Sequence, residues 1–285
     1  MANLKEIRNR IVSVSSTMQI TSAMKMVSAA KLKKAQDAIT AMRPYSEKLT
    51  ELIQSLSASL EGDVAAEYTT QREVKKVLVV AITSNRGLCG ALNNNVIKQV
   101  RILSDTYGHD NVGVFAIGKK ANDGLHKSNY VVANRSDIYD DLTFDNTAEI
   151  AQSLTHLFLD GEYDKVELVY NQFVNAATQY VVNEQFLPLA PIKGSAAISS
   201  DYIFEPSKEE IVLELIPKSL KTQLYKAVRD SFAAEHGARM TAMHKATDNA
   251  TDLRNQLKLT YNKARQAAIT GEILEIVGGA EALNN

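Results

Sequence analysis

Residues 76–83 have the sequence KVLVVAIT, a run of apolar and mostly β-branched side chains that predicts a buried β-strand. Further strands are expected at 112–117, 130–133, 166–170 and 179–186, and helices at 91–103, at 119–126 and from Asn146 or Thr147 to Leu159. This alternation of strands and helices predicts an α/β domain with a mostly parallel sheet and helices on its faces.

The chain on the N-terminal side of this region is expected to form one long helix. Apolar side chains recur at spacings of three and four, the pattern of a coiled-coil seam, at Leu4, Ile7, Ile11, Val14 and Met18. No glycine or proline occurs before Pro44, so the uninterrupted helix is about 60 Å long at 1.5 Å per residue. We expect a kink or a restart at Pro44 and then the same spacing as far as about Leu60.

The C-terminal region has a matching helical pattern. Ser207 to Glu210 fits a capping box, and Pro217 is expected to kink or break the helix. Beyond it, a strict spacing of four and three links Ala246, Ala250, Leu253, Leu257, Thr260, Ala264, Ala267, Gly271, Leu274 and Gly278. Small residues at most of these positions fit either a tightly packed helical bundle or a slender antiparallel coiled coil. The expected domains are 1–60, 61–206 and 207–285.

The composition and charge of the chain exclude several classes of site and partner. The 285 residues include one cysteine, Cys89, which excludes an internal disulfide and a cysteine-rich metal site. The longest apolar run, 77–82, is too short to cross a membrane, and the first residues do not resemble a signal peptide. The net charge of −1 divides into +6 over 1–43, +3 over 218–285 and −10 between them. Basic ends would suit an acidic protein, nucleic acid or an anionic membrane. Single-stranded nucleic acid is disfavoured for the first helix, because no aromatic residues lie between its basic residues.

Two glycine-containing segments have features of phosphate-binding loops. Gly113 to Lys120 has the spacing of a P-loop, but Lys120 replaces the hydroxyl residue that would bind Mg²⁺, and the intervening residues are typical of a strand. The turn Ser84 to Gly90 follows the first strand and could be a weak phosphate cradle, but a simple tight turn is favoured. Cys89 lacks the basic neighbours of a nucleophile, and the histidines are scattered, so no cofactor and no metal are expected.

Five segments resemble, in order, the gamma subunit family of F-type ATP synthases of the bacterial type. They are Ile20–Leu32 (ITSAMKMVSAAKL), Ser84–Asn93 (SNRGLCGALN), Glu235–Asn249 (EHGARMTAMHKATDN), Tyr261–Glu272 (YNKARQAAITGE) and Glu275–Ala280 (EIVGGA). The resemblance covers essentially the whole chain. Asn85 departs from the family's usual Asp, and the cysteine insertion of chloroplast members is absent, so thiol regulation is not expected.

The resemblance implies a non-catalytic rotor shaft. Its end helices would form an antiparallel coiled coil, with Ile7, Ile11, Val14, Leu253 and Leu257 in the seam. The shaft would turn inside a ring of three alpha and three beta subunits and couple proton transport to ATP synthesis or hydrolysis. A Rossmann-like middle domain would bind the epsilon subunit and the membrane proton-carrying ring. The location would be peripheral, at the cytoplasmic face of the inner (plasma) membrane, with no direct membrane insertion and no nucleic acid bound.

The same resemblance assigns contact residues by their positions in this sequence. Met24 and Lys25 would lie near the lever of the beta subunit, and Arg265 and Gln266 would bind its catch loop. Tyr202 and Glu205 would contact the membrane ring.

Two other classes of function remain as alternatives. One is an enzyme that binds a nucleotide at the Ser84–Gly90 turn and uses its helical arms to dimerise. The other is an adaptor whose basic first helix docks on an anionic membrane, although the apolar stripe of that helix holds no Trp or Phe.

Overall fold

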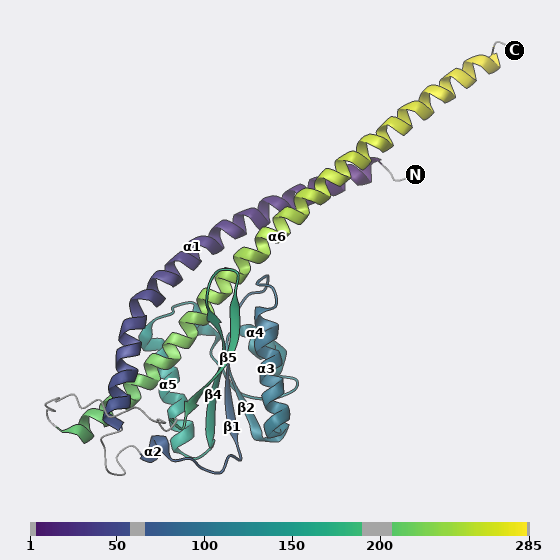
Figure 1. Ribbon diagram of the computed structural model, residues 1–285. Helices are drawn as coiled ribbons and strands as arrows, with labels where there is room; N and C mark the ends of the chain where they lie inside the picture. Colours follow the sequence, from purple (N-terminus) through teal and green to yellow (C-terminus); the bar gives the residue numbers. More distant parts are fainter. Residues whose placement is uncertain (1–3, 58–65, 190–206, 284–285) are drawn as a thin grey trace. The chain divides into compact units, whose positions relative to one another are not determined.

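The computed structural model describes residues 4–57, 66–189 and 207–283 (Figure 1). The chain divides into two compact units. One is made of residues 1–28 and 240–285, and the other of residues 29–239. The unit borders differ from the expected domains, because part of each long helix belongs to the unit that contains the sheet.

The larger unit is built on a five-stranded sheet with the strand order β3-β2-β1-β4-β5. The strands are β1 (Val77–Ile82), β2 (Val112–Ile117), β3 (Tyr130–Asn134), β4 (Lys165–Phe173) and β5 (Gln179–Leu187). All neighbouring strands are parallel except β5, which pairs antiparallel with β4. This confirms the predicted mostly parallel, Rossmann-like sheet.

Helices cover both faces of this sheet. Even-numbered residues of β1 pack in one apolar cluster with α5 (Phe144–Leu159) and with the first part of α6 (Lys208–Leu283). Odd-numbered residues of β1 pack in a second cluster with α3 (Leu92–Tyr107) and α4 (Lys119–Leu125). Because every β1 side chain is completely buried and each of its Val, Leu and Ile side chains contributes roughly 1.5–3 kcal/mol, this strand is the centre of the fold.

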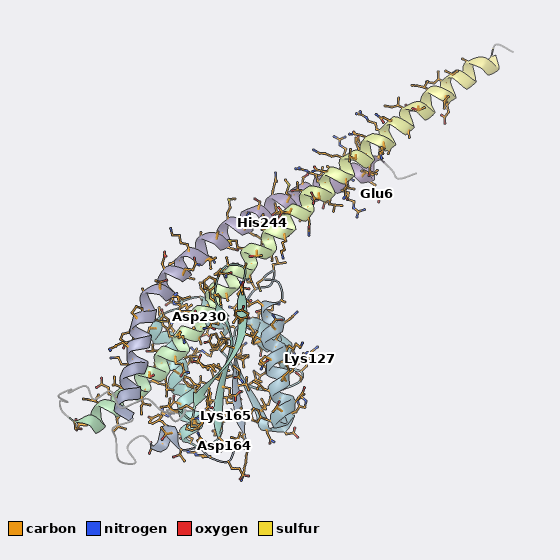
Figure 2. The ribbon with its side chains drawn as sticks, viewed as in Figure 1. Glu6, Lys127, Asp164, Lys165, Asp230 and His244 are labelled. Carbon is orange, nitrogen blue, oxygen red and sulfur yellow. The ribbon has the colours of Figure 1, made fainter. Side chains whose placement is uncertain are left out.

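Short elements complete the unit. They are α2 (Ala66–Thr69) and two 3-10 turns, His109–Asn111 and Ser136–Tyr139. Asp164, labelled in Figure 2, accepts hydrogen bonds from the amides of Lys75 and Lys76 at 2.9 and 2.8 Å and so fixes the chain as it enters β1.

The start of α5 differs from the prediction. Thr143 caps the helix, and its hydroxyl accepts a hydrogen bond from the amide of Asn146 at 3.3 Å. The expected cap residues, Asn146 and Thr147, already lie inside the helix. Thr143 can cap because its backbone is extended, with φ −101° and ψ 165°, which aims the side chain back at the exposed amides.

The two long helices run through both units. They are α1 (Leu4–Ser57) and α6, and each contains its proline, Pro44 or Pro217, without a break in the helix. The sequence predicts a kink or a break at Pro217, and the helix is not broken there. Ile216 and Leu220 on either side of it are almost completely buried, and this packing compensates for the lost backbone hydrogen bond. The predicted cap is present, since the amide of Glu210 donates to the Ser207 hydroxyl at 3.2 Å.

Candidate functional site

In the unit made of residues 1–28 and 240–285, α1 and α6 form an antiparallel pair (Figure 1). The Oγ1 atoms of Thr21 and Thr247 lie 2.8 Å apart, and Met18 Sδ accepts a hydrogen bond from Thr251 at 3.4 Å. Residue numbers therefore fall along α1 as they rise along α6. Ile7 and Ala250 are buried between the helices at 7% and 8% exposure, as expected of the predicted coiled coil.

The seam on α1 follows the predicted spacing, because Ile7 is buried and Ile11 and Val14 are half-buried. On α6 every second buried position lies one residue beyond the position that the spacing predicts. From residue 247 to 271 the buried or half-buried positions are Thr247, Ala250, Thr251, Arg254, Leu257, Tyr261, Ala264, Ala268 and Gly271. Leu257 therefore lies in the seam, but Leu253 is 39% exposed and does not.

The polar residue Arg254 occupies the position next to Leu253. Its NH1 donates to Met18 Sδ at 3.5 Å, and its Nε is buried without a hydrogen-bond partner. A long side chain of this kind can keep its aliphatic part in a seam while the guanidinium reaches the edge. The prediction of Leu253 was wrong because the spacing alone does not exclude a polar residue that packs through its stem.

The end of α6 has no described partner helix. The pairing places Leu4, the first described residue of α1, level with about residue 265 of α6 at 1.5 Å per residue. Residues 272–280 are all exposed. This segment, which we call the bare end, carries four large apolar side chains at 54–70% exposure: Ile273, Leu274, Ile276 and Val277.

The contact residues expected from sequence lie in two separate places. Met24 and Lys25 are half-buried on α1, near the level of Thr247, whereas Arg265 and Gln266 are exposed on α6. The two pairs are separated by roughly 30 Å along α6 at 1.5 Å per residue. Tyr202 and Glu205 lie outside the described residues.

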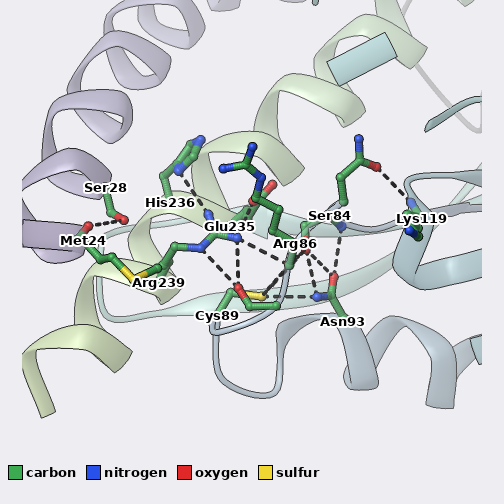
Figure 3. A network of polar contacts seen from close by, with 12 residues as sticks. Met24, Ser28, Ser84, Arg86, Cys89, Asn93, Lys119, Glu235, His236 and Arg239 are labelled. Atoms are coloured by element: carbon green, nitrogen blue, oxygen red, sulfur yellow. Dashed lines mark hydrogen bonds and ion pairs between the residues drawn. The ribbon is translucent and has the colours of Figure 1, made fainter. Parts of the chain in front are cut away.

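In the larger unit, the Ser84–Gly90 turn is a tight polar turn between β1 and α3 (Figure 3). Ser84 Oγ donates to the carbonyl of Arg86 at 2.6 Å, and Asn93 Oδ1 accepts from the Ser84 amide at 3.0 Å. Cys89 is 1% exposed, and burial raises the pKa of its thiol. A protonated, buried thiol is a poor nucleophile, in agreement with the sequence-based view of this residue.

Asn85 connects the same turn to two neighbouring segments. Its Oδ1 accepts from the Lys119 amide at 2.9 Å, and its Nδ2 donates to the carbonyl of Ser136, also at 2.9 Å. A carboxylate could accept the first bond but could not donate the second. The amide at this position therefore has a structural role of its own, which an Asp could fill only in part.

The amides at the start of α4 are already bonded to protein groups. The amides of Lys119, Lys120 and Ala121 donate to Asn85 Oδ1, to the Ser84 carbonyl and to Thr83 Oγ1. A phosphate would need these donors free. Residues 113–117, the P-loop-like segment, form strand β2 itself. The geometry therefore provides no phosphate cradle at the P-loop-like segment.

One cluster outside these sites resembles a catalytic triad. Ser104 Oγ lies 2.8 Å from His109 Nδ1, and His109 Nε2 lies 3.1 Å from Asp105. Ser104 is completely buried and also accepts from Asn129 at 2.8 Å, so no substrate could reach its hydroxyl. Its role is to join the end of α3 to the chain before β3. Among the described residues no group of three or more potential metal ligands occurs.

A buried ion pair on α6 was missed from sequence. Arg239 NH2 lies 2.6 Å from Glu235 Oε1, and both side chains are at most 10% exposed. Burial raises the pKa of Glu235, although Arg239 opposes this effect. The pKa of the adjacent His236 is lowered to about 4, first by burial and then by the charges of Arg239 and Lys31. The spacing of four between Glu235 and Arg239 was the available signal, but it is typical of surface pairs as well.

Comparisons with known proteins agree with one another. A family model described as ATP synthase matches residues 3–283. The ATP synthase gamma chain of Flavobacterium johnsoniae is 77% identical over 285 residues, covering 100% of both chains, and that of Flavobacterium psychrophilum is 76% identical over 99% of both. A chain in the cryo-EM structure of the Tetrahymena thermophila mitochondrial ATP synthase central stalk and c-ring matches with a TM-score of 0.62 at 26% identity, covering 80% of this chain and 99% of that chain. The chain belongs to the family of ATP synthase gamma chains.

Proposed function

We propose that the chain is the central rotor shaft of a proton-translocating F-type ATP synthase. It couples rotation of the membrane ring to ATP synthesis or hydrolysis at the beta subunits and is not catalytic by itself. Family membership and the fold shared with a central stalk support this role. The observation from this chain that best supports the proposal is the bare end of α6, which continues beyond the described part of α1 as a single helix and exposes apolar side chains over residues 272–280.

An isolated helix end with four large exposed apolar side chains is unfavourable in water. Burying each of them would contribute roughly 1.5–3 kcal/mol. A ring of three alpha and three beta subunits with an apolar opening would supply that burial on all sides. Because a sleeve of this kind needs no directional bonds, the helix end could turn within it without breaking specific contacts.

Polar contacts would pass force between this shaft and the ring. We place Met24 and Lys25 at the beta-subunit lever and Arg265 and Gln266 at the catch loop. The exposure of Arg265 and Gln266 leaves their donors available to carboxylates and carbonyls of a partner. The distance of roughly 30 Å between the two pairs along α6 would let the ring contact the shaft at two levels.

The larger unit would lie outside the ring and bind the epsilon subunit and the membrane ring, the latter through Tyr202 and Glu205. No helix among the described residues is long and apolar enough to cross a membrane. From the family resemblance we propose that the chain is a peripheral subunit at the cytoplasmic face of the inner (plasma) membrane.

Co-expression of the tagged chain with the alpha and beta subunits of the same source tests this role. We expect one copy of the chain to co-purify with three alpha and three beta subunits in a complex that hydrolyses ATP. A variant carrying Ile273→Lys and Ile276→Lys should reduce recovery of that complex, whereas Glu272→Gln on the same segment should not. Purification of the chain as a separate dimer that binds ATP at micromolar concentration would favour the enzyme alternative instead.

A further inference from the structure

The outer part of the Ser84–Gly90 turn is an exposed tip formed by Arg86, Gly87 and Leu88. Leu88 is 63% exposed, and its backbone has φ +62°. A left-handed backbone is unfavourable for a leucine, and exposure of its side chain offers no compensation within this chain. Other contacts must therefore hold the tip in this conformation.

Contacts from α6 supply that support (Figure 3). Arg239 Nε and NH2 each donate to the carbonyl of Gly87 at 3.3 Å, and NH2 also lies 3.4 Å from the carbonyl of Arg86. Arg239 is separated from these carbonyls by about 150 positions in the sequence, so the contact joins the tip directly to the long helix. Ser84 Oγ shares the Arg86 carbonyl from the opposite end of the turn.

Arg239 is itself held in place. Glu235, one helical turn earlier, binds NH2 at 2.6 Å, and His236 Nδ1 lies 3.3 Å from NH1. The Glu235 and Arg239 side chains are 10% and 8% exposed, and a buried ion pair that loses one partner leaves an uncompensated charge. The guanidinium therefore has little freedom to leave the two carbonyls.

The helix beneath Arg239 is also seated closely on the sheet unit. A Cβ at Gly237 would lie 3.2 Å from Ala176 Cα and 3.3 Å from its carbonyl oxygen, so α6 approaches the β4–β5 turn at backbone distance. A local shift of α6 would disturb this contact as well as the tip.

We propose that Arg239, held by Glu235, is a positioning residue that fixes the exposed Arg86–Leu88 tip to α6, so that a load applied to the tip passes directly into the long helix. The consequence for rotation rests on the proposed shaft function, but the contact between Arg239 and the tip does not. The simpler alternative is that Glu235 and Arg239 only stabilise one turn of α6.

Exchanging the two residues separates these accounts. The variant Glu235→Arg with Arg239→Glu retains an ion pair at the same spacing, but residue 239 then has no donor for the Arg86 and Gly87 carbonyls. The peptide bond after Arg86 is a trypsin site within the tip, and the bond after the exposed Lys127 is a matched site elsewhere in the same unit. Initial cleavage rates at both bonds are measured by mass spectrometry on the full chain.

We expect the exchange to accelerate cleavage after Arg86 at least tenfold and to leave cleavage after Lys127 unchanged. Arg239→Lys, which keeps the charge and the ion pair but not the forked donor, should give a smaller increase at Arg86 and serves as the test if the exchanged chain does not fold. Equal rates at Arg86, or equal increases at both bonds, would overturn the proposal, because the pair would then serve only helix stability. Co-purification of the unaltered chain with its ring decides the shaft function separately.

Discussion

The hydroxyl oxygens of Thr21 and Thr247 lie 2.8 Å apart and join α1 to α6, although 226 positions separate the two residues. Each hydroxyl also lies near a carbonyl of its own helix, Met18 O at 3.1 Å and Met243 O at 2.8 Å. Because each hydroxyl carries one proton, one threonine donates across the pair and the other donates back into its helix. This bond sets the register of the antiparallel pair.

Replacing the two threonines by valine should show strong coupling. A single change, Thr21→Val or Thr247→Val, should lower the free energy of unfolding by about 1 kcal/mol, because the remaining hydroxyl loses its partner in the seam. The double change should cost less than the sum of the two, since two apolar methyl groups then face each other. Urea denaturation of the full chain measures this. Additive single effects would mean that the hydroxyls do not interact.

Leu257 and Leu253 provide a matched pair for the seam register. Leu257→Glu should destabilise the helix pair by several kcal/mol, because a carboxylate would lie in the seam without a partner. Leu253→Glu, at a position 39% exposed, should change the free energy of unfolding by less than about 0.5 kcal/mol. Circular dichroism during urea denaturation compares the two variants. Equal losses would contradict the register described for α6.

The seam shows which features of the helix pair can be predicted from the sequence and which cannot. The apolar spacing predicted both long helices, and in the structure Ile7 is buried and Ile11 and Leu257 are half-buried, because the period determines which face of a helix is buried. Period did not distinguish Leu253 from Arg254, since the neighbouring position is decided by contacts such as that of Arg254 with Met18. The helix continues through Pro217, because burial of the residues on either side outweighs the local preference of proline to end a helix.

The contact of Glu235 and Arg239 with the Ser84–Gly90 turn could not be predicted from sequence for another reason. The apolar runs at 76–83 and 112–117 predicted β1 and β2 to within one residue, because continuous β-branched runs are typical of buried parallel strands. Glu235 and Arg239 have a visible spacing of four, but their contact with the Ser84–Gly90 turn depends on chain folding over about 150 positions. A sequence without aligned relatives carries no signal for such a contact.

His236 should make stability depend on pH in a defined window. Its pKa is lowered to about 4 in the folded chain, from an ordinary value near 6.5. As pH falls from about 6.5 to 4 the unfolded chain gains a proton that the folded chain does not, so this histidine reduces stability by at most about 1.4 kcal/mol per pH unit. Above pH 6.5 it is neutral in both states and has no such effect.

The matched variant for this prediction is His236→Gln. Glu235 faces the same cluster and its raised pKa gives a slope of the opposite sign, so the informative quantity is the difference between the original chain and the variant at each pH. We expect urea midpoints at pH 7.5, 5.5 and 4.5 to show that the stability of the original chain, relative to that of the variant, falls as the pH falls. Parallel curves would mean that His236 titrates normally in the folded state.

Arg265 and Gln266 test the proposed catch contact. A charge-assisted hydrogen bond contributes roughly 1.5–3 kcal/mol, which is strong enough to order a catch and weak enough to be broken in each cycle. Arg265→Ala with Gln266→Ala should lower ATP turnover of the assembled complex about tenfold or more, while assembly continues because Ala264 and Ala268 keep the seam. Lys263→Ala, an exposed cation on the same helix, is the control. Unchanged turnover would mean that the two residues are only solvated surface.

Direct observation of rotation tests the central claim. Tyr130 is 72% exposed, whereas Cys89 is 1% exposed, so Tyr130→Cys provides a selectively reactive site for a bead or gold particle. The labelled chain is assembled with alpha and beta subunits, the ring is fixed to a surface, and ATP is added. The shaft function predicts continuous rotation of the probe in one direction, at a rate that follows ATP turnover. ATP hydrolysis by the same complexes without any directed motion of the probe would contradict it.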